Sequence, residues 1–473
     1  MPVYDCNGHR GDIVMKVIVL NGSPKGDNSA TMQYIHYIRK KFPRHELQIT
    51  NISQRIAKIE KDEKEFLRII DTVRASDCVL WATPVYVSLV PSQYKRFIEL
   101  ITERKVQDAF RNKYAAVFTT SIHFYDHTAH NYLNAVCDDL GMRYIDTYSA
   151  DMYDLLRRKE RRAVEIFAAH MFEAIEHNHA FQRRHAPLVP GGLVYTPGDV
   201  VNPVDAGDKK ILIVTDDGER DGNLGRMIAR FAASFTGPVE IVNLSDLDIK
   251  GGCLGCIKCG LDGECVYEGR DGFIEFYRTK VQTADILVLA GAVKDRFLSW
   301  KWKQYMDRRF FHNHIPSLPG TQLALIISGP VSQMQNLQQI IDAYGEWEQA
   351  NLVGYVTDEY EESSLVDDLL QNLAERLVNF AKEEYKKPVT FLGLGGAKIF
   401  RDDIWGRLRI VFQADHAYYK KHGLYDFPQG NYKLRFFNWK MMLLTKIPAV
   451  RREFPKRVEA EIIKPLKNVL KKI

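Results

Sequence analysis

The sequence predicts an α/β protein with two consecutive doubly wound parallel-sheet domains and a basic, aromatic C-terminal extension. Three observations carry this prediction. Apolar runs typical of buried strands alternate with helical patterns through residues 16–177, as in a parallel sheet covered by helices on both faces. The same order starts again at residue 210. The last residues, from 389 on, follow neither pattern.

The composition is that of an ordinary globular protein. The chain has 473 residues, of which 45% are hydrophobic and 26% charged, and this length suits two or three domains. Disordered and disulfide-rich secreted proteins are thereby excluded as descriptions of the whole chain, and no apolar run reaches the ~20 residues of a membrane span. Residues 1–14 lack the apolar core of a signal peptide, so a cytoplasmic location is expected.

The first domain is predicted over residues 15–179. Its first strand is an apolar run that ends at Asn21-Gly22, and a helical pattern follows after a short polar loop. Further apolar runs and amphipathic segments alternate in the same way. The expected strands are 16–20, 47–49, 78–82, 114–119 and 144–148, and the expected helices are 30–41, 61–74, 93–104, 129–140 and 154–177.

A second domain is predicted over residues 208–388, after a linker at 180–207 that is rich in proline and glycine. The run Lys210–Val214 repeats Lys16–Leu20, and Ala284–Leu289 matches Ser76–Trp81 at an offset of 208 residues. Later segments correspond too, ending with a closing helix at 365–386. We interpret this as a tandem duplication of one α/β domain. The alternative is two unrelated halves whose buried strands merely look alike.

The loop between the first strand and the first helix predicts a phosphate site. In doubly wound sheets, ligands bind at the carboxyl ends of the strands, where a helix N-terminus offers free N–H groups. Glycines at 22 and 26 let the backbone curl, and short polar side chains and one cation are available as donors. These candidates are Ser23, Lys25, Asn28 and Ser29. The alternative is a tight turn followed by an ordinary capped helix.

Two further loops at the same sheet edge would contact a flat ring. One follows the strand at 78–82, and the other follows the strand at 114–119. Together the three loops suit a planar ligand that carries a phosphate. The ring candidates are Thr83, Pro84, Val85, Tyr86, Thr120 and Ser121.

These residues resemble the flavodoxin-like NAD(P)H-dependent FMN reductase family, including its iron–sulfur flavoprotein branch. Gly22-Ser23-Pro24 with Asn28-Ser29 matches the first family signature, and Thr83–Tyr86 with Pro91 and Lys95 matches the second. The resemblance implies two tandem flavodoxin-like domains, with FMN bound by the first. Its phosphate would lie on Ser23–Ser29, and its ring against Thr83–Tyr86 and the loop at 119–125. That third loop departs from the family pattern, because His123-Phe124-Tyr125 replaces the usual glycines.

Four cysteines lie close together in the second domain. Cys253, Cys256, Cys259 and Cys265 follow the spacing C-x2-C-x2-C-x5-C, in a loop with small residues that allow wrapping around a compact inorganic core. The spacing resembles the [4Fe–4S] motif of iron–sulfur flavoproteins. Free or redox-active thiols and a zinc site are the alternatives.

The second domain is expected to bind no FMN. At the position of Gly22-Ser23 it has Asp216-Asp217, whose carboxylates would repel a phosphate dianion. The first domain therefore has flavin loops without the cysteines, and the second has the cysteines without flavin loops. Members of the resembled family commonly form dimers. We therefore expect an intramolecular pseudo-dimer in which the cysteine loop faces the FMN, and a homo-oligomer of the whole chain is the further alternative.

The C-terminal extension, 389–473, carries most of the positive charge. Residues 390–473 hold 18 Lys/Arg and 7 Asp/Glu, a net charge of +11, whereas the whole chain carries +5. The favoured interpretation is a strap on the acidic remainder or a docking surface for an electron-transfer partner. Peripheral membrane contact is the second alternative, and nucleic-acid binding is disfavoured.

The expected function is an FMN-dependent oxidoreductase, with NAD(P)H as donor and an iron–sulfur cluster, a small acceptor or a ferredoxin-like carrier receiving electrons. The cofactor does the chemistry, so no catalytic side chain is expected. The alternatives are a non-enzymatic electron carrier or redox sensor, and a scaffold in which both sites are inactive.

Overall fold

The computed structural model describes residues 14–216, 218, 221–454 and 464. The chain divides into two compact units, Met1–Asp415 and His416–Ile473. The predictions made for residues 1–13 and for Asp217 lie outside the described ranges. Within them, no helix is long and apolar enough to cross a membrane.

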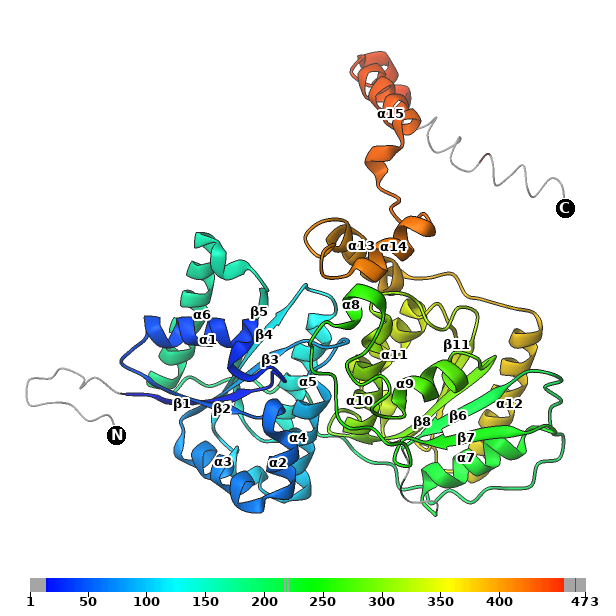
Figure 1. Ribbon diagram of the computed structural model, residues 1–473, viewed down its shortest axis with the longest axis horizontal. Coiled ribbons are helices and arrows are strands. Elements are labelled where there is room, and N and C mark those ends of the chain that lie inside the picture. Colours follow the sequence, from blue (N-terminus) through cyan, green and yellow to red (C-terminus); the bar gives the residue numbers. More distant parts are fainter. Residues whose placement is uncertain (1–13, 217, 219–220, 455–463, 465–473) are drawn as a thin grey trace, which may run out of the picture. The chain divides into compact units, whose positions relative to one another are not determined.

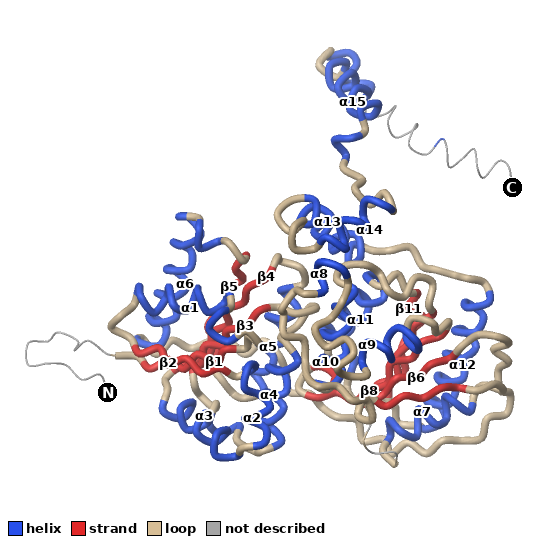
Figure 2. The backbone as a smooth tube through the Cα atoms, in the orientation of Figure 1, coloured by secondary structure: helices blue, strands red, loops and turns tan. Residues whose placement is uncertain are grey.

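A five-stranded parallel sheet forms the centre of the first domain (Figure 2). Its spatial order is β2-β1-β3-β4-β5, the flavodoxin-like order, which places the ligand edge between the loops after β1 and β3. In this sheet Val17 of β1 pairs with Leu47 on one side and Cys78 on the other. The strands are β1 (Lys16–Asn21), β2 (Glu46–Asn51), β3 (Cys78–Pro84), β4 (Tyr114–Ser121) and β5 (Arg143–Asp151).

Helices cover both faces of this sheet (Figure 1). One face packs on α1 (Ala30–Lys41) and α6 (Arg158–Glu176), through an apolar core that includes Val19, Ile35 and Ala168. The other face packs on α3 (Glu63–Ala75), α4 (Ser92–Glu103) and α5 (Asp126–Asp139). The apolar residues of these helices recur at helical spacing, which is why the sequence predicts them well.

The segment predicted as one helix at 61–74 differs from the structure. A short helix, α2 (Ile56–Lys61), comes first, and α3 starts only at Glu63. Asp62 separates them in an extended conformation, and its carboxylate accepts the N–H of Glu65 as an N-cap. The acidic side chain therefore ends one helix and starts the next.

The second domain repeats this architecture. Its parallel strands lie in the order β7-β6-β8-β10-β11, and β9 (Phe297–Leu298) adds antiparallel to β8. The fold class predicted from the sequence is thus confirmed: two flavodoxin-like parallel-sheet domains in tandem. The parallel strands are β6 (Ile211–Thr215), β7 (Val239–Asn243), β8 (Ile286–Lys294), β10 (Gln322–Ser328) and β11 (Asn351–Thr357).

The helices of the second domain also lie on both faces of its sheet. On one face are α7 (Asn223–Ala233) and α12 (Ser363–Lys382), and on the other are α9 (Phe273–Phe276), α10 (Trp300–Arg308) and α11 (Gln335–Trp347). The short α8 (Cys259–Asp262) lies within the cysteine loop. Between the domains, residues 180–207 contain no helix or strand longer than a single bridge, yet Tyr195 is fully buried.

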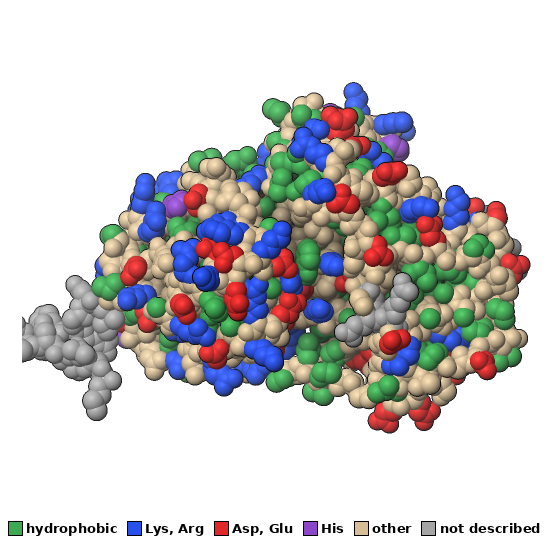
Figure 3. Space-filling view, turned by 60° about the horizontal axis from the view of Figure 1, so that its bottom comes forward, with side chains coloured by type: hydrophobic (Ala, Val, Ile, Leu, Met, Phe, Trp, Pro, Cys, Tyr) green, Lys and Arg blue, Asp and Glu red, His purple; other side chains and the backbone are tan. Residues whose placement is uncertain are grey.

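One apolar core joins the two domains. It includes Leu20 and Phe97 from the first domain and Leu289 and Tyr305 from the second. Helices α4 and α10 pack against each other within it. The surface over the face seen in Figure 3 mixes basic, acidic and hydrophobic side chains. The two sheets therefore share one continuous apolar interior.

The extension begins with a helix packed on the first unit. In α13 (Phe391–Trp405), the N–H of Gly393 donates to Glu346 of α11, and Phe400 lies 4.4 Å from Phe124, centroid to centroid. Further along are α14 (Gln413–Lys421) and α15 (Tyr432–Leu444). None of the α15 side chains is buried. The C-terminal extension thus contains a segment up to Asp415 that packs on the rest of the chain, and an exposed helix after it.

Candidate functional site

The predicted phosphate loop lies between β1 and α1. Ser23 is 1% exposed, and its hydroxyl oxygen accepts the N–H of Lys25 at 3.2 Å. Ser29 caps α1 by accepting the N–H of Met32, while Asn28 is exposed. The first turn of a helix leaves N–H groups without carbonyl partners inside the helix. Hydroxyls, amide groups and a lysine therefore gather here, a donor set that fits a phosphate monoester.

Two glycines shape this loop. A Cβ atom on Gly22 would lie 2.6 Å from Oγ1 of Thr83, because the loop passes directly over the end of β3. Gly26 has φ of +57°, which a glycine adopts without strain. The glycine motif of the sequence therefore reflects a close backbone crossing between the first and second ligand loops.

The second loop follows β3. Its turn is closed by reciprocal backbone bonds between Tyr86 and Leu89 at 2.8 and 3.1 Å, with both Val87 and Ser88 at positive φ. The N–H of Val85 donates to the carbonyl of Thr120 at 3.1 Å. This bond joins the second loop to the third.

The third loop is linked to the first through side chains. The hydroxyls of Thr31 and Thr120 are 2.6 Å apart, and that of Thr119 is 2.6 Å from Nε2 of His130. The structure thus brings all three predicted loops to one sheet edge, with Ser121 at the end of β4. Sequence reasoning identified these loops because each directly follows a buried strand.

The aromatic residues of the third loop turn toward the second domain and α13. The ring of Phe124 lies 4.7 Å from that of Trp347, and the hydroxyl of Tyr125 donates to the carbonyl of Leu392 at 2.9 Å. His123 instead contacts Asp126, whose carboxylate raises the His123 pKa. These two aromatic side chains therefore make contacts with the second domain and with α13.

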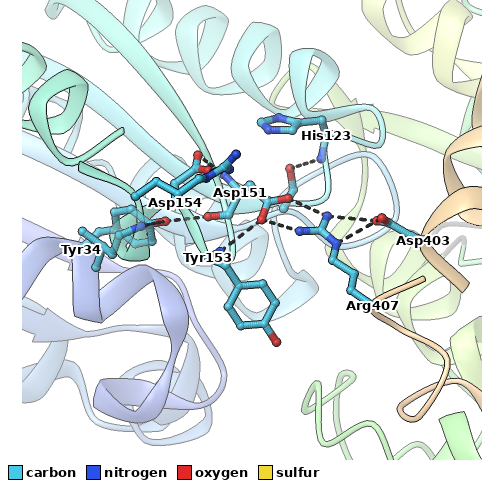
Figure 4. A network of polar contacts seen from close by, with 10 residues as sticks. Tyr34, His123, Asp151, Tyr153, Asp154, Asp403 and Arg407 are labelled. Atoms are coloured by element: carbon cyan, nitrogen blue, oxygen red, sulfur yellow. Dashed lines mark hydrogen bonds and ion pairs between the residues drawn. The ribbon is translucent and has the colours of Figure 1, made fainter. Parts of the chain in front are cut away.

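An ion pair ties the segment after α13 to this edge of the first sheet (Figure 4). Arg407 donates two hydrogen bonds of 2.6 Å to Asp151 at the end of β5 and also contacts Asp403. Burial would raise the pKa of Asp151, but the hydrogen bonds and charge of Arg407, together with the N–H of Tyr153 and the nearby His123, lower it. Tyr34 donates to the backbone carbonyl of Asp151 at 2.6 Å. The sequence offered no signal for this long-range pair.

The cysteine loop, residues 253–265, lies against the second ligand loop, which follows β3. A Cβ atom on Gly255 would collide with the hydroxyl oxygen of Tyr86 and would lie 3.4 Å from Cε of Lys25. The carbonyl of Cys253 accepts a 3.0 Å hydrogen bond from Gln93, at the start of α4. Gly255, which lies between Cys253 and Cys256, thus packs against two predicted FMN ligands of the first domain.

The four thiols of the cysteine loop influence one another electrostatically. Burial raises the pKa values of Cys253 and Cys259 to about 12, and it is reinforced by Asp307 at Cys253 and by the other three thiols at Cys259. Both are free thiols, as are Cys256 and Cys265. Among the described residues, no group of three or more His, Cys, Asp or Glu side chains is arranged to hold a metal ion. The four-cysteine ligand set remains a prediction from spacing.

In the second domain, Asp216 occupies the place of the first phosphate loop. Its carboxylate accepts from the indole N–H of Trp302 at 2.9 Å and from the hydroxyl of Ser299. Burial is the largest influence on this carboxyl and raises its pKa above 3.8. The sequence predicted a carboxylate here but not its two donors.

We expect Asp216→Asn to increase the free energy of unfolding by about 1 kcal/mol at pH 7, a typical size for a single substitution. Because the folded-state pKa is raised, the folded state prefers the protonated carboxyl and loses stability as pH rises through that pKa. The amide cannot ionise, so the gain should vanish below about pH 4, near the unfolded-state pKa. Urea unfolding at pH 3.5 and pH 7 measures this, and an equal gain at both would contradict it.

Two buried ion pairs lie at the contact between α4 and α10, and the sequence did not predict them. Lys95 and Lys303 are each fully buried, and each forms an ion pair four residues along its own helix, with Glu99 and Asp307 respectively. Each lysine also donates across the domain interface to a backbone carbonyl. Lys95, although part of the second motif, therefore points away from the first domain's loops.

Comparison with known proteins matches the first domain to a family. Residues 15–153 match the family described as NADPH-dependent FMN reductase. No curated protein matches the chain.

Solved structures similar to the chain include three bacterial proteins. The flavoenzyme NAD(P)H:(acceptor) oxidoreductase from Paracoccus denitrificans is 21% identical, covering 34% of this chain and 98% of its own, with a TM-score of 0.27. An FMN-dependent NADH-azoreductase from Bacillus anthracis, in complex with FMN, is 14% identical over 33% and 98%, with a TM-score of 0.24. A flavodoxin, WrbA-like protein from Agrobacterium tumefaciens is 13% identical over 35% and 100%, with a TM-score of 0.27. The family match is thus confined to the first domain, over residues 15–153.

Proposed function

We propose that the chain is an FMN-dependent oxidoreductase that takes electrons from NAD(P)H in the cytoplasm. The observation that carries this is the meeting of three loops at one sheet edge, within the segment that matches the FMN reductase family. Bound FMN would supply hydride and single-electron chemistry. The chain would bind its phosphate with Ser23, Lys25, Asn28 and Ser29 and orient its ring with Thr83, Pro84, Val85, Tyr86, Thr120 and Ser121.

In this proposal, electrons leave toward the cysteine loop of the second domain. The contact of Gly255 with Tyr86 and Lys25 supports this direction, because it puts the loop beside the proposed flavin ligands. A [4Fe–4S] cluster on Cys253, Cys256, Cys259 and Cys265 would relay electrons to a ferredoxin-like carrier or a small acceptor. Free redox thiols and zinc are the competing occupants, and the domain boundaries 15–179, 208–388 and 389–473 belong to the same proposal.

The test is the visible spectrum of anaerobically purified full-length protein, with flavin, iron and zinc quantified. We expect one FMN per chain and bleaching of its absorbance on addition of NADPH or NADH. FMN without bleaching would support the electron carrier or sensor instead. A chain that takes up neither FMN nor iron would overturn the proposal in favour of a scaffold.

We also propose that α15 docks on an anionic membrane surface. Its apolar side chains are solvent-exposed, among them Tyr432 at 75%, Phe436 at 64% and Trp439 at 57%. The helix carries Lys433, Arg435 and Lys440 and no acidic residue. Aromatic and apolar groups with interspersed cations suit the boundary between lipid headgroups and acyl chains.

Flotation with lipid vesicles tests this docking. The full chain should float with phosphatidylserine-containing vesicles at low salt and float less with pure phosphatidylcholine or at high salt. We expect the double substitution Phe436→Ser, Trp439→Ser to reduce flotation at least fivefold. Phe391→Ser, at an aromatic position 84% exposed on α13, is the matched control and should have no effect. Equal loss in both variants, or no flotation of the parent, would contradict docking through α15.

A further inference from the structure

The two domains exchange equivalent hydrogen bonds, one in each direction. Nζ of Lys303 donates to the carbonyl of Tyr86 at 2.8 Å, and Nζ of Lys95 donates to the carbonyl of Lys294 at 2.9 Å. Lys303 lies 208 positions after Lys95, and Lys294 lies 208 positions after Tyr86. A reciprocal pattern of this kind is the signature of a two-fold interface.

The carboxylates of the ion pairs follow the same rule. Asp307 accepts the N–H of Ser92 at 2.8 Å, and Glu99 accepts the N–H of Trp300 at 2.6 Å, again at an offset of 208. Each helix start is therefore capped by the carboxylate of the other domain. The two lysines are thus structurally equivalent, which makes one a control for the other.

The two receiving carbonyls lie in equivalent turns. Tyr86 precedes Val87 and Ser88, and Lys294 precedes two residues that also have positive φ. Consecutive non-glycine residues at positive φ are strained. A buried ammonium that donates to the carbonyl at the start of such a turn stabilises the turn against relaxation.

The turns differ in what they carry. Tyr86 ends the Thr83–Tyr86 loop of the proposed flavin ring site, whereas Lys294 ends a stretch of the second domain that lacks this motif. We propose that Lys303 is a positioning residue for FMN: the second domain holds the ring loop of the first in its binding conformation through the hydrogen bond from Lys303 to the Tyr86 carbonyl. This inference rests on the proposed function.

Amide hydrogen exchange of the flavin-free full chain tests the positioning directly. Lys303→Met should speed exchange at least fivefold in the peptide containing residues 86–89, where the N–H of Leu89 also donates to the Tyr86 carbonyl. The peptide containing residues 294–297 should change less than twofold. Lys95→Met should give the opposite pattern. Equal acceleration of both turns in both variants would mean general loosening and would overturn the inference.

FMN titration of the same variants supplies the functional readout. Lys303→Met should raise the FMN dissociation constant about tenfold and alter the visible circular dichroism of bound FMN, while Lys95→Met stays within twofold of the parent. Similar dissociation constants and spectra for the two variants would overturn the inference. Failure of the parent to bind FMN would instead defeat the proposed function, and the exchange result would still report on the turn.

A third variant separates the hydrogen bond to Tyr86 from the ion pair with Asp307. Asp307→Asn removes the charge of the ion pair but retains the Lys303 amine and an oxygen to accept the N–H of Ser92. We expect exchange in residues 86–89 and the FMN dissociation constant to stay within twofold of the parent. A loss tenfold or greater would show that the ion pair, and not the bond to Tyr86, determines the loop, and would overturn the inference.

Discussion

Ser23→Asp is expected to weaken FMN binding about a thousandfold. Ser23 is 1% exposed at the start of the phosphate loop, so a carboxylate there would face a bound phosphate with little intervening water. Two like charges ~4 Å apart repel by about 4 kcal/mol at an effective dielectric constant near 20. Every 1.4 kcal/mol is a factor of ten in affinity. Titration of FMN fluorescence against the purified chain measures the change.

Two matched variants isolate the effect of charge at this loop. Ser23→Ala removes the hydroxyl alone and should weaken binding by about tenfold, as for one hydrogen bond to a charged group. Asp27→Asn removes the existing, exposed carboxylate of the same loop and should leave affinity unchanged or slightly improved. If Ser23→Asp and Ser23→Ala bound FMN with equal affinity, the phosphate would not lie at this loop.

Arg308→Met is expected to lower the free energy of unfolding by about 3–5 kcal/mol, because it leaves the buried carboxylate of Asp271 without its partner. Arg308 is 1% exposed and donates two bonds, of 2.8 and 2.9 Å, to Asp271. It also donates to the carbonyl of Gly251 at 2.9 Å and lies 4.1 Å from the ring of Tyr267. These partners flank the cysteine loop on both sides, so the same change should release that loop.

Arg278→Met is the matched control, because Arg278 forms an ion pair with Glu268 at 43% and 32% exposure. Exposed pairs contribute only about 0–1 kcal/mol. Burial would raise the pKa of Asp271, but the hydrogen bonds and charge of Arg308, together with the N–H groups of Lys250 and Phe273, lower it. The stability that this pair contributes is therefore present above about pH 4 and lost as pH falls through the folded-state pKa. Urea unfolding of both variants at pH 7 should separate them, and similar losses would contradict the assignment.

Local sequence determined the sheets and the loops at their ends. Buried strands such as Lys16–Asn21 have apolar runs bounded by turn residues, and the helices have apolar residues at helical spacing. The ligand loops were predictable because each follows such a strand, and parallel strands present their carboxyl ends at one edge. The boundary at Asp62 was missed because a short polar helix without an apolar stripe leaves no periodic signal.

Tertiary structure alone decided how the domains complement each other. The bonds from Lys303 to Tyr86 and from Arg407 to Asp151 join residues more than 200 positions apart. A sequence pattern specifies which side of an element is apolar, but it does not specify which distant carbonyl a buried lysine meets. That choice depends on the packing of α4 against α10, where burial without a partner would be prohibitive for a charge. The ligand-loop motifs can therefore be found in the sequence alone. The hydrogen bond from Lys303 that supports the proposed flavin loop depends instead on how the two domains pack.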